Sequence, residues 1–231
     1  LSCSENRVTF KSDRFEISLN NQGQVIAFTD NSTDLDYHYK DTLSFLLSIW
    51  KNGKAISPLS ASLDDDTKLL SLTFPGDHTA VIKVEEKPSH ITFEVVSLTK
   101  SEEVELVLWG PYPTIINDVI GETVGVVRNK DFAIGIQSLN PKTLGGYPWT
   151  DNDEMPQIDI FEGGDYSDLS RAGKRYVLYR VEAAKPTDFG STLQAYTRNR
   201  NKERTIKNWG KDQYVAPAYN DGGLVGSKIA L

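Results

Sequence analysis

The sequence has few of the residues that build disulfides and metal centres. It contains one cysteine and three histidines in 231 residues, so it can form neither an internal disulfide nor a cysteine-based zinc site. No apolar run approaches the roughly 20 residues that a membrane-spanning helix needs, and the densest run, Leu43–Trp50, is far shorter. The 25 lysines and arginines are outnumbered by 32 aspartates and glutamates, and this net charge of −7 argues against binding to nucleic acid.

What the sequence does contain is alternation of apolar and polar residues, which is typical of β-strands with one buried face. Turn signals such as Asn21-Gln22-Gly23 and Pro75-Gly76-Asp77 separate the alternating segments. The clearest predicted strands are Phe15–Leu19, Val25–Thr29, Leu70–Phe74, Ala80–Glu85, Ile91–Val95, Val104–Leu108, Val124–Arg128, Asp131–Ser138 and Tyr176–Val181. Short strands at this spacing predict an all-β fold of antiparallel sheets, either a sandwich or a barrel.

One segment departs from the alternating pattern and predicts a helix. Its apolar residues Phe189, Leu193 and Tyr196 fall at positions i, i+4 and i+7, the spacing of one helix face. We therefore expect one short C-terminal helix over Asp188–Asn199.

The rest of the chain has no internal repeat and no low-complexity linker. We expect a single β domain over residues 10–231, after a spacer over residues 1–9. Because Lys228–Leu231 resembles a strand interrupted in mid-pattern, this domain is predicted to be the N-terminal module of a longer chain. A surface for the following domain is then expected on the predicted helix, on Trp209 and on the C-terminal strand.

The single cysteine predicts a location. Leu1-Ser2-Cys3 resembles the end of a bacterial lipobox, in which the cysteine is acylated, and a polar spacer follows it. The alternative is a chance cysteine near a frayed terminus. Acylation of Cys3 would tether the protein to the cell envelope as an outer-membrane lipoprotein that contacts the membrane only through its lipid anchor.

Acidic clusters and histidines provide no recognisable catalytic set. Asp64–Asp66 is typical of a solvated turn, and Asp151–Glu154 begins like a calcium loop but lacks the glycine and the final glutamate of that motif. His38, His78 and His90 are not spaced like metal ligands on one element. The glycine-rich segments lack the Lys-Ser/Thr pair of a phosphate-binding loop. We therefore predict no catalytic residue, no metal and no cofactor.

Aromatic residues are the most informative candidates for binding. Two segments place large rings beside glycine and proline, and rings held rigidly in loops offer flat faces suited to stacking on sugars. The candidate carbohydrate-binding residues are Trp109, Tyr112, Tyr147 and Trp149. For Trp109 the alternative is that the ring ends a strand and packs in the core.

A wider resemblance involves several of these segments. The runs Trp109–Ile116, Ile120–Arg128, Phe132–Gln137 and Leu139–Thr143, with Phe15–Asn20, Gly23 and Lys54–Ser60, resemble the N-terminal domain of large, glycoside-hydrolase-like bacterial lipoproteins. The resemblance covers about residues 10–145 and implies a galactose-mutarotase-like β-supersandwich, which in such proteins packs against a catalytic (β/α)8 barrel. Mutarotases of this fold use a histidine and a glutamate, and no motif here matches either.

Three functions therefore remain open. The first is a non-catalytic, carbohydrate-associated scaffold module of a glycan-degrading protein of the cell envelope, which supports a following catalytic domain. The second is an autonomous sugar-binding module, which needs exposed rings. The third is an aldose epimerase, which needs a histidine beside the bound sugar.

Overall fold

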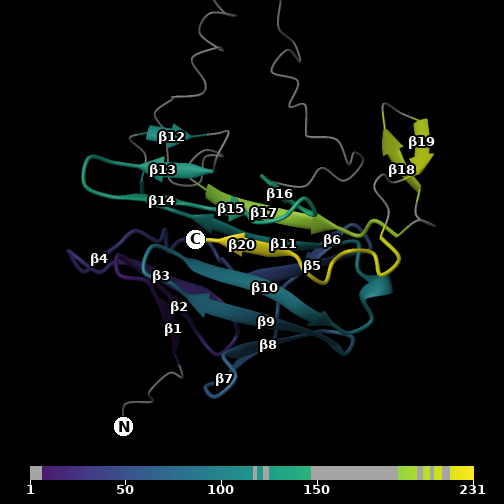
Figure 1. Ribbon diagram of the computed structural model, residues 1–231, viewed down its shortest axis with the longest axis horizontal. Coiled ribbons are helices and arrows are strands. Elements are labelled where there is room, and N and C mark those ends of the chain that lie inside the picture. The colour runs from purple at the N-terminus through teal and green to yellow at the C-terminus, as the bar shows by residue number, and fades with distance from the viewer. Residues whose placement is uncertain are drawn as a thin grey trace, which may run out of the picture.

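The computed structural model describes residues 7–116, 119–121, 125–146, 192–201, 205–208, 211–214 and 219–231. In these ranges the fold is all-β, as predicted, and the helical structure is limited to the 3₁₀ turn η1 (Ser101–Glu103). The strands form five antiparallel sheets (Figure 1). Within the same ranges, no helix has the length and apolar character needed to cross a membrane.

Three larger sheets make up the body of the domain. The four-stranded sheet has the order β1 (Val8–Lys11), β2 (Phe15–Leu19), β3 (Val25–Asp30), β4 (Leu35–Asp36). The six-stranded sheet has the order β15 (Gln137–Ser138), β20 (Lys228–Ala230), β10 (Ile91–Leu98), β9 (His78–Glu86), β8 (Leu69–Phe74), β7 (Ser60–Asp64). The five-stranded sheet has the order β16 (Thr143–Gly145), β17 (Thr192–Arg198), β11 (Leu106–Pro113), β5 (Leu47–Lys51), β6 (Lys54–Ile56).

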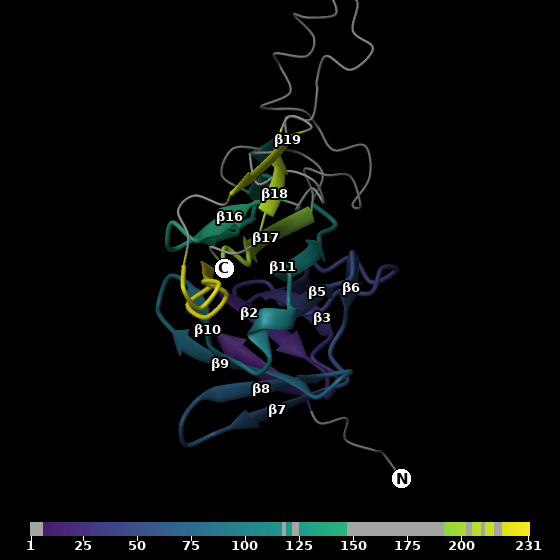
Figure 2. The same cartoon turned by 90° about the vertical axis from the view of Figure 1, so that its right-hand side faces the viewer.

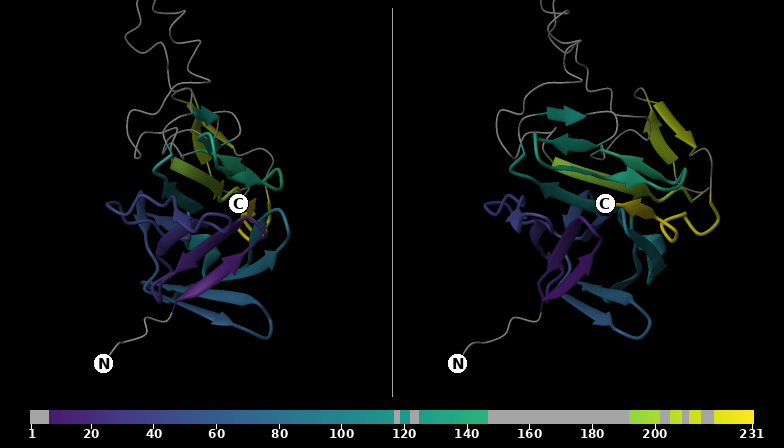
Figure 3. Two further views of the ribbon diagram at one scale, coloured as in Figure 1. Left: turned by 90° about the vertical axis from the view of Figure 1, so that its left-hand side faces the viewer. Right: turned by 60° about the vertical axis from the view of Figure 1, so that its left-hand side comes forward.

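Two smaller sheets lie at one end of the molecule, away from β7 and β8 (Figures 1 and 2). They are formed by β12 (Val119–Gly121), β13 (Val126–Arg128) and β14 (Ala133–Gly135), and by β18 (Thr205–Asn208) and β19 (Lys211–Tyr214). Figure 3 shows the four-stranded sheet, in purple, beside the β7–β8 hairpin. The backbone hydrogen bond from Ala61 N to Asn21 O, 2.7 Å long, joins these two parts.

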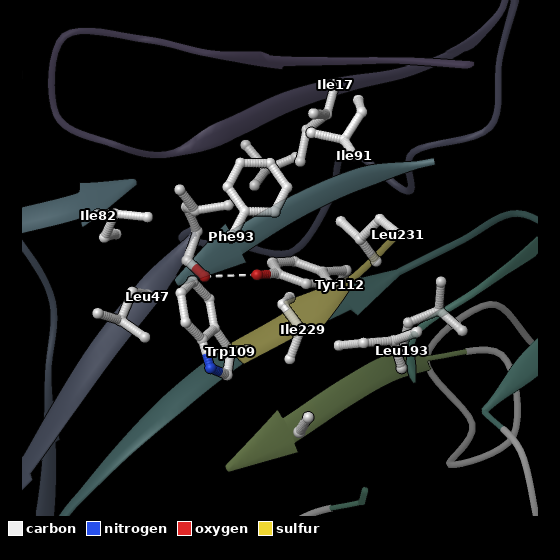
Figure 4. Packing of buried hydrophobic residues seen from close by; sticks show 14 of the residues in the cluster. Ile17, Leu47, Ile82, Ile91, Phe93, Trp109, Tyr112, Leu193, Ile229 and Leu231 are labelled. Carbon is white, nitrogen blue, oxygen red and sulfur yellow. Dashed lines mark hydrogen bonds between the residues drawn. The ribbon is translucent and has the colours of Figure 1, made fainter. Parts of the chain in front are cut away.

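One hydrophobic core connects the three larger sheets. It is formed by buried side chains that alternate along their strands as the sequence predicts, for example Ile17 of β2, Ile82 of β9 and Phe93 of β10 (Figure 4). Burying a side chain of this size stabilises the fold by about 1.5–3 kcal/mol relative to its exposure. The alternating pattern therefore predicts which face of each of these strands is buried.

The central strands of the five-stranded sheet are buried on both faces. In β11, Val107 and Trp109 belong to the main core, whereas Leu106 and Leu108 pack with Tyr196 in a second cluster. Successive side chains of a strand point to opposite faces. Both faces of β11 are therefore apolar, which explains the nearly continuous run of hydrophobic residues in this segment.

The helix predicted over Asp188–Asn199 is wrong where the structure describes it, because Thr192–Arg198 form β17. Leu193 and Ala195 face the main core, and Tyr196 faces the second cluster on the other side of the sheet. The strand pairs with β11 on one side and with β16 on the other. These ladders satisfy its backbone groups and outweigh the helical spacing of Leu193 and Tyr196.

The C-terminal strand lies inside a sheet. β20 pairs with both β10 and β15, and Ile229 is fully buried. The strand itself is confirmed. Ile229 belongs to the core, whereas Ala230 and Leu231 line an apolar cleft on the surface. Trp209, which was also expected on a surface for a following domain, lies outside the described residues.

Candidate functional site

A surface cleft of about 620 Å³ opens beside β14 and β15, within the range of about 300–1,000 Å³ that is typical of ligand sites. Its floor is largely apolar and is lined by Phe15, Val126, Phe132, Ala133, Ile134, Gly135, Ile136, Leu139, Ala230 and Leu231. Its polar lining residues are Arg14, Ser89, His90 and Gln137. The cleft therefore combines an apolar surface with a few hydrogen-bonding groups.

The β13–β14 hairpin forms one wall of the cleft. The Asn129 side chain shapes the turn, since its Oδ1 accepts hydrogen bonds from the backbone N of Asp131 (2.9 Å) and of Phe132 (2.7 Å). A Cβ atom on Gly135 would lie 2.8 Å from Val126 Cγ2, so a larger residue at this position would require the Val126 side chain to move. The strands predicted over Val124–Arg128 and Asp131–Ser138 pair with each other, over Val126–Arg128 and Ala133–Gly135.

Two phenylalanine rings line the cleft. Phe132 stacks on Tyr37, with ring centroids 4.6 Å apart and an interplanar angle of 4°. Phe15 begins β2 and packs against Phe28 of β3 at 5.8 Å between centroids. The sequence analysis missed both rings as site candidates, because each lies in an alternating strand or hairpin pattern and lacks the glycine–proline context used to select aromatic residues.

The cleft has no acidic lining: no aspartate or glutamate side chain is among the described residues that line it. Arg14 and His90 line it instead. The Ser89 hydroxyl and His90 Nδ1 share a hydrogen bond of 2.9 Å. In a chain whose net charge is −7, this local balance favours ligands that are neutral or negatively charged.

Trp109 and Tyr112 do not line this cleft, which corrects their prediction as sugar-stacking residues. Both are fully buried, and Figure 4 shows the two rings within the core. Trp109 Nε1 donates a hydrogen bond of 2.9 Å to Ser227 Oγ, and the Tyr112 hydroxyl donates to the Leu46 carbonyl. Burial raises the pKa of Tyr112 well above its ordinary value. The rings lie on the core face of β11, so neither offers a face to a ligand.

Other predicted site residues lie outside the described part of the chain or are solvated. Tyr147, Trp149, Cys3 and Asp151–Glu154 are outside it. Asp64 is exposed at the end of β7, Asp65 and Asp66 lie in the exposed turn that follows, and hydrogen bonds from Thr67 and Asp66 lower the pKa of Asp64. Among the described residues, no group of three histidine, cysteine, aspartate or glutamate side chains could hold a metal ion.

His78 belongs to a structural network that lies outside the cleft. It is 1% exposed, and its Nδ1 donates to the Thr99 carbonyl (3.2 Å) while its Nε2 accepts from the Lys51 ammonium (3.3 Å). The Glu103 carboxylate also binds Lys51 and lies 3.7 Å from Nε2, and the hydrogen bond from Lys51 lowers the pKa of Glu103. The His78 ring is therefore buried beneath Lys51 and is not accessible to a sugar.

The side chain of His38 is buried beside Phe28. The residue is 5% exposed and its ring packs edge-on against Phe28, 5.4 Å between centroids. Within the described part of the chain, neither Nδ1 nor Nε2 has a hydrogen-bond partner. Burial lowers the pKa of this imidazole, and the Asp36 carboxylate only partly opposes that effect.

We expect mild acid to destabilise the fold through His38. The folded pKa lies below the ordinary value of 6.5, so below that pH the unfolded chain binds more protons than the folded chain. The free energy of unfolding then falls by up to about 1.4 kcal/mol per pH unit until the folded pKa is reached. Urea denaturation between about pH 8 and pH 5 measures this slope.

The matched variants are His38→Leu and His90→Leu. The first should remove most of the slope in this window, and the second, at the partly exposed rim of the cleft, should leave it in place. An unchanged slope in His38→Leu would contradict the assignment.

The fold and the cleft define a class of protein: an all-β, sandwich-like module with a surface cleft of ligand size. No protein-family model matches the sequence, and a search of the curated proteins finds no match. Because modules with one fold carry many activities, the function has to be argued from the cleft itself.

Proposed function

We propose that this chain is a non-catalytic, carbohydrate-associated module of a glycan-degrading protein, and that the cleft beside β14 and β15 is its sugar-binding surface. The observation that carries the proposal is the composition of the cleft, with two phenylalanines in an apolar floor and polar groups beside them. A sugar ring has the same division, since its C–H groups form apolar faces and its hydroxyls need hydrogen-bond partners.

The arrangement of the titratable groups favours binding over catalysis. Epimerisation needs a general acid and a general base on a bound sugar, and glycoside hydrolysis needs two carboxyl groups across it. His90 lines the cleft without a carboxylate among the described lining residues. The close pair of His78 and Glu103 is held together by Lys51 away from the cleft.

The choice of ligand, the attachment to the cell envelope and the neighbouring catalytic domain are argued from the sequence. The resemblance to carbohydrate-active lipoproteins supports the choice of a saccharide as ligand. The lipobox-like Leu1-Ser2-Cys3 supports attachment to the cell envelope through Cys3. The resemblance also supports a catalytic domain in the same protein. The same resemblance supports a galactose-mutarotase-like β-supersandwich as the fold of this domain.

Titration with a panel of neutral and acidic mono- and disaccharides, followed by NMR of isotope-labelled protein, tests the binding role. We expect chemical-shift changes at residues that line the cleft, including Ile134 and Gln137. Replacing Leu139, a lining residue that is 41% exposed, by serine should weaken binding about fivefold, because it removes roughly 1 kcal/mol of apolar contact.

Leu59→Ser is the matched control, because Leu59 is 60% exposed and does not line the cleft. It should bind as the wild type does. Absence of shifts with every saccharide would refute the binding role. Anomer interconversion faster than the spontaneous rate would favour the aldose epimerase instead.

A further inference from the structure

We propose that the cleft selects a sugar that carries a carboxylate, such as a uronic acid, and that Arg14 binds this group. The inference rests on the proposed function and names the substrate class of the same site. It is carried by the position of Arg14 and His90 on one cleft whose described lining residues include no acidic side chain. Charge complementarity therefore points to an anionic ligand.

The backbone around Arg14 is firmly held. Ser12 N donates to Phe15 O (2.7 Å), and Phe15 N donates to Ser12 Oγ (3.0 Å), which closes the turn between β1 and β2. The Arg14 carbonyl accepts from Asn31 N at 3.0 Å. An arginine on a rigid turn loses less conformational freedom on binding than one on a flexible loop.

The Arg14 guanidinium forms no ion pair with Asp30, its acidic neighbour. Asp30 feels the charge of Arg14, but its carboxylate oxygens accept hydrogen bonds from Ser32 (2.9 and 2.7 Å) and Thr33 (2.8 Å). Among the described residues, the Arg14 side chain makes no hydrogen bond or ion pair. Its donors are therefore available to a ligand in the cleft.

A second turn positions His90 in the same cleft as Arg14. The hydrogen bond from Asp13 N to Pro88 O, 3.0 Å long, ties the turn that carries Arg14 to the turn that carries Ser89 and His90. His90 Nδ1 is engaged by the Ser89 hydroxyl. Within the described residues, this leaves Nε2 as the ring nitrogen that can reach a ligand.

This combination suits a carboxylate on a sugar ring. A guanidinium presents two parallel N–H groups that match the two oxygens of a carboxylate, and such bidentate contacts are stronger than those to neutral hydroxyls. The apolar floor beside them, which includes Phe15, lowers the local dielectric and strengthens the contact. A neutral sugar would make contacts only with the apolar floor and with the remaining polar lining residues.

Isothermal titration with galacturonate, its methyl ester and galactose tests the inference. We expect galacturonate to bind about tenfold more tightly than either neutral sugar, and Arg14→Gln to abolish that difference. Arg128→Gln is the matched control, because Arg128 is exposed on β13 outside the cleft, and it should keep the preference.

Each other outcome is decisive. Equal affinity for the acid and its methyl ester, or an unchanged preference in Arg14→Gln, would overturn this inference while leaving a neutral-sugar module in place. Binding of none of the three sugars, together with no response in the wider saccharide panel, would overturn the proposed function itself.

Discussion

Replacing Trp109 by alanine is expected to lower the free energy of unfolding by about 3–5 kcal/mol. The indole is fully buried beside Phe93, 6.4 Å between ring centroids, and its N–H donates to Ser227. Truncation would leave a cavity where the main core joins β11 to β10, and it would remove one of the hydrogen bonds of the buried Ser227 hydroxyl. Urea denaturation followed by circular dichroism measures the loss.

The Trp109→Phe variant tests whether Trp109 acts through packing in the core. It keeps an aromatic ring in the core and loses the N–H and part of the volume, so its loss of stability should be clearly smaller than that of the alanine variant. If Trp109→Ala kept wild-type stability and instead lost affinity for saccharides, the core assignment of Trp109 would be wrong and the stacking role would return.

Gly110→Ala is expected to lower the free energy of unfolding by at least about 3 kcal/mol. Gly110 has φ +80°, and a Cβ atom there would lie 2.8 Å from the Leu193 carbonyl oxygen and 2.8 Å from the Tyr112 nitrogen. Both atoms belong to the backbone of the β11–β17 pair, where the register shifts between Trp109 and Tyr112. Backbone atoms cannot rotate away as a side chain can, so one strand would have to move.

Gly53→Ala supplies the control for the conformational part of this effect. Gly53 has φ +68°, but a Cβ atom there meets nothing within 4 Å. Its substitution should cost only the strain of a left-handed residue, about 1 kcal/mol. Equal losses in the two variants, measured by chemical denaturation, would show that β11 and β17 separate easily and would contradict the close approach at Gly110.

Local patterns predict most of the strands because their cause is local. Along β2, Phe15, Ile17 and Leu19 alternate with polar residues and are buried, and the turn that follows contains Gly23 at φ +74°. Side-chain direction in a strand reverses at every residue. A strand that is buried on one face therefore shows an alternating apolar and polar pattern within a few consecutive residues. The hairpins β2–β3, β8–β9 and β13–β14 could be predicted for the same reason.

The candidate site could not be predicted in this way. Arg14, His90 and Phe132 come from three turns that are far apart in the sequence, and each is an ordinary residue in its own segment. The hydrogen bond between Asp13 and Pro88 and the stacking of Phe132 on Tyr37 bring them together. Such contacts depend on how distant segments pack together, and the spacing of residues in the sequence does not predict them.

The sequence by itself determined that this protein is all-β, with strands and turns set by the period of its apolar residues. Only the tertiary structure decided that Thr192–Arg198 is a strand, because two neighbouring strands satisfy its backbone on both sides. It also decided that Trp109 and Tyr112 lie in the core, since both faces of β11 are buried. The periodicity of apolar residues shows which side of a segment is apolar. The strands that pair with the segment, and the extent of its burial, depend on residues distant in the chain.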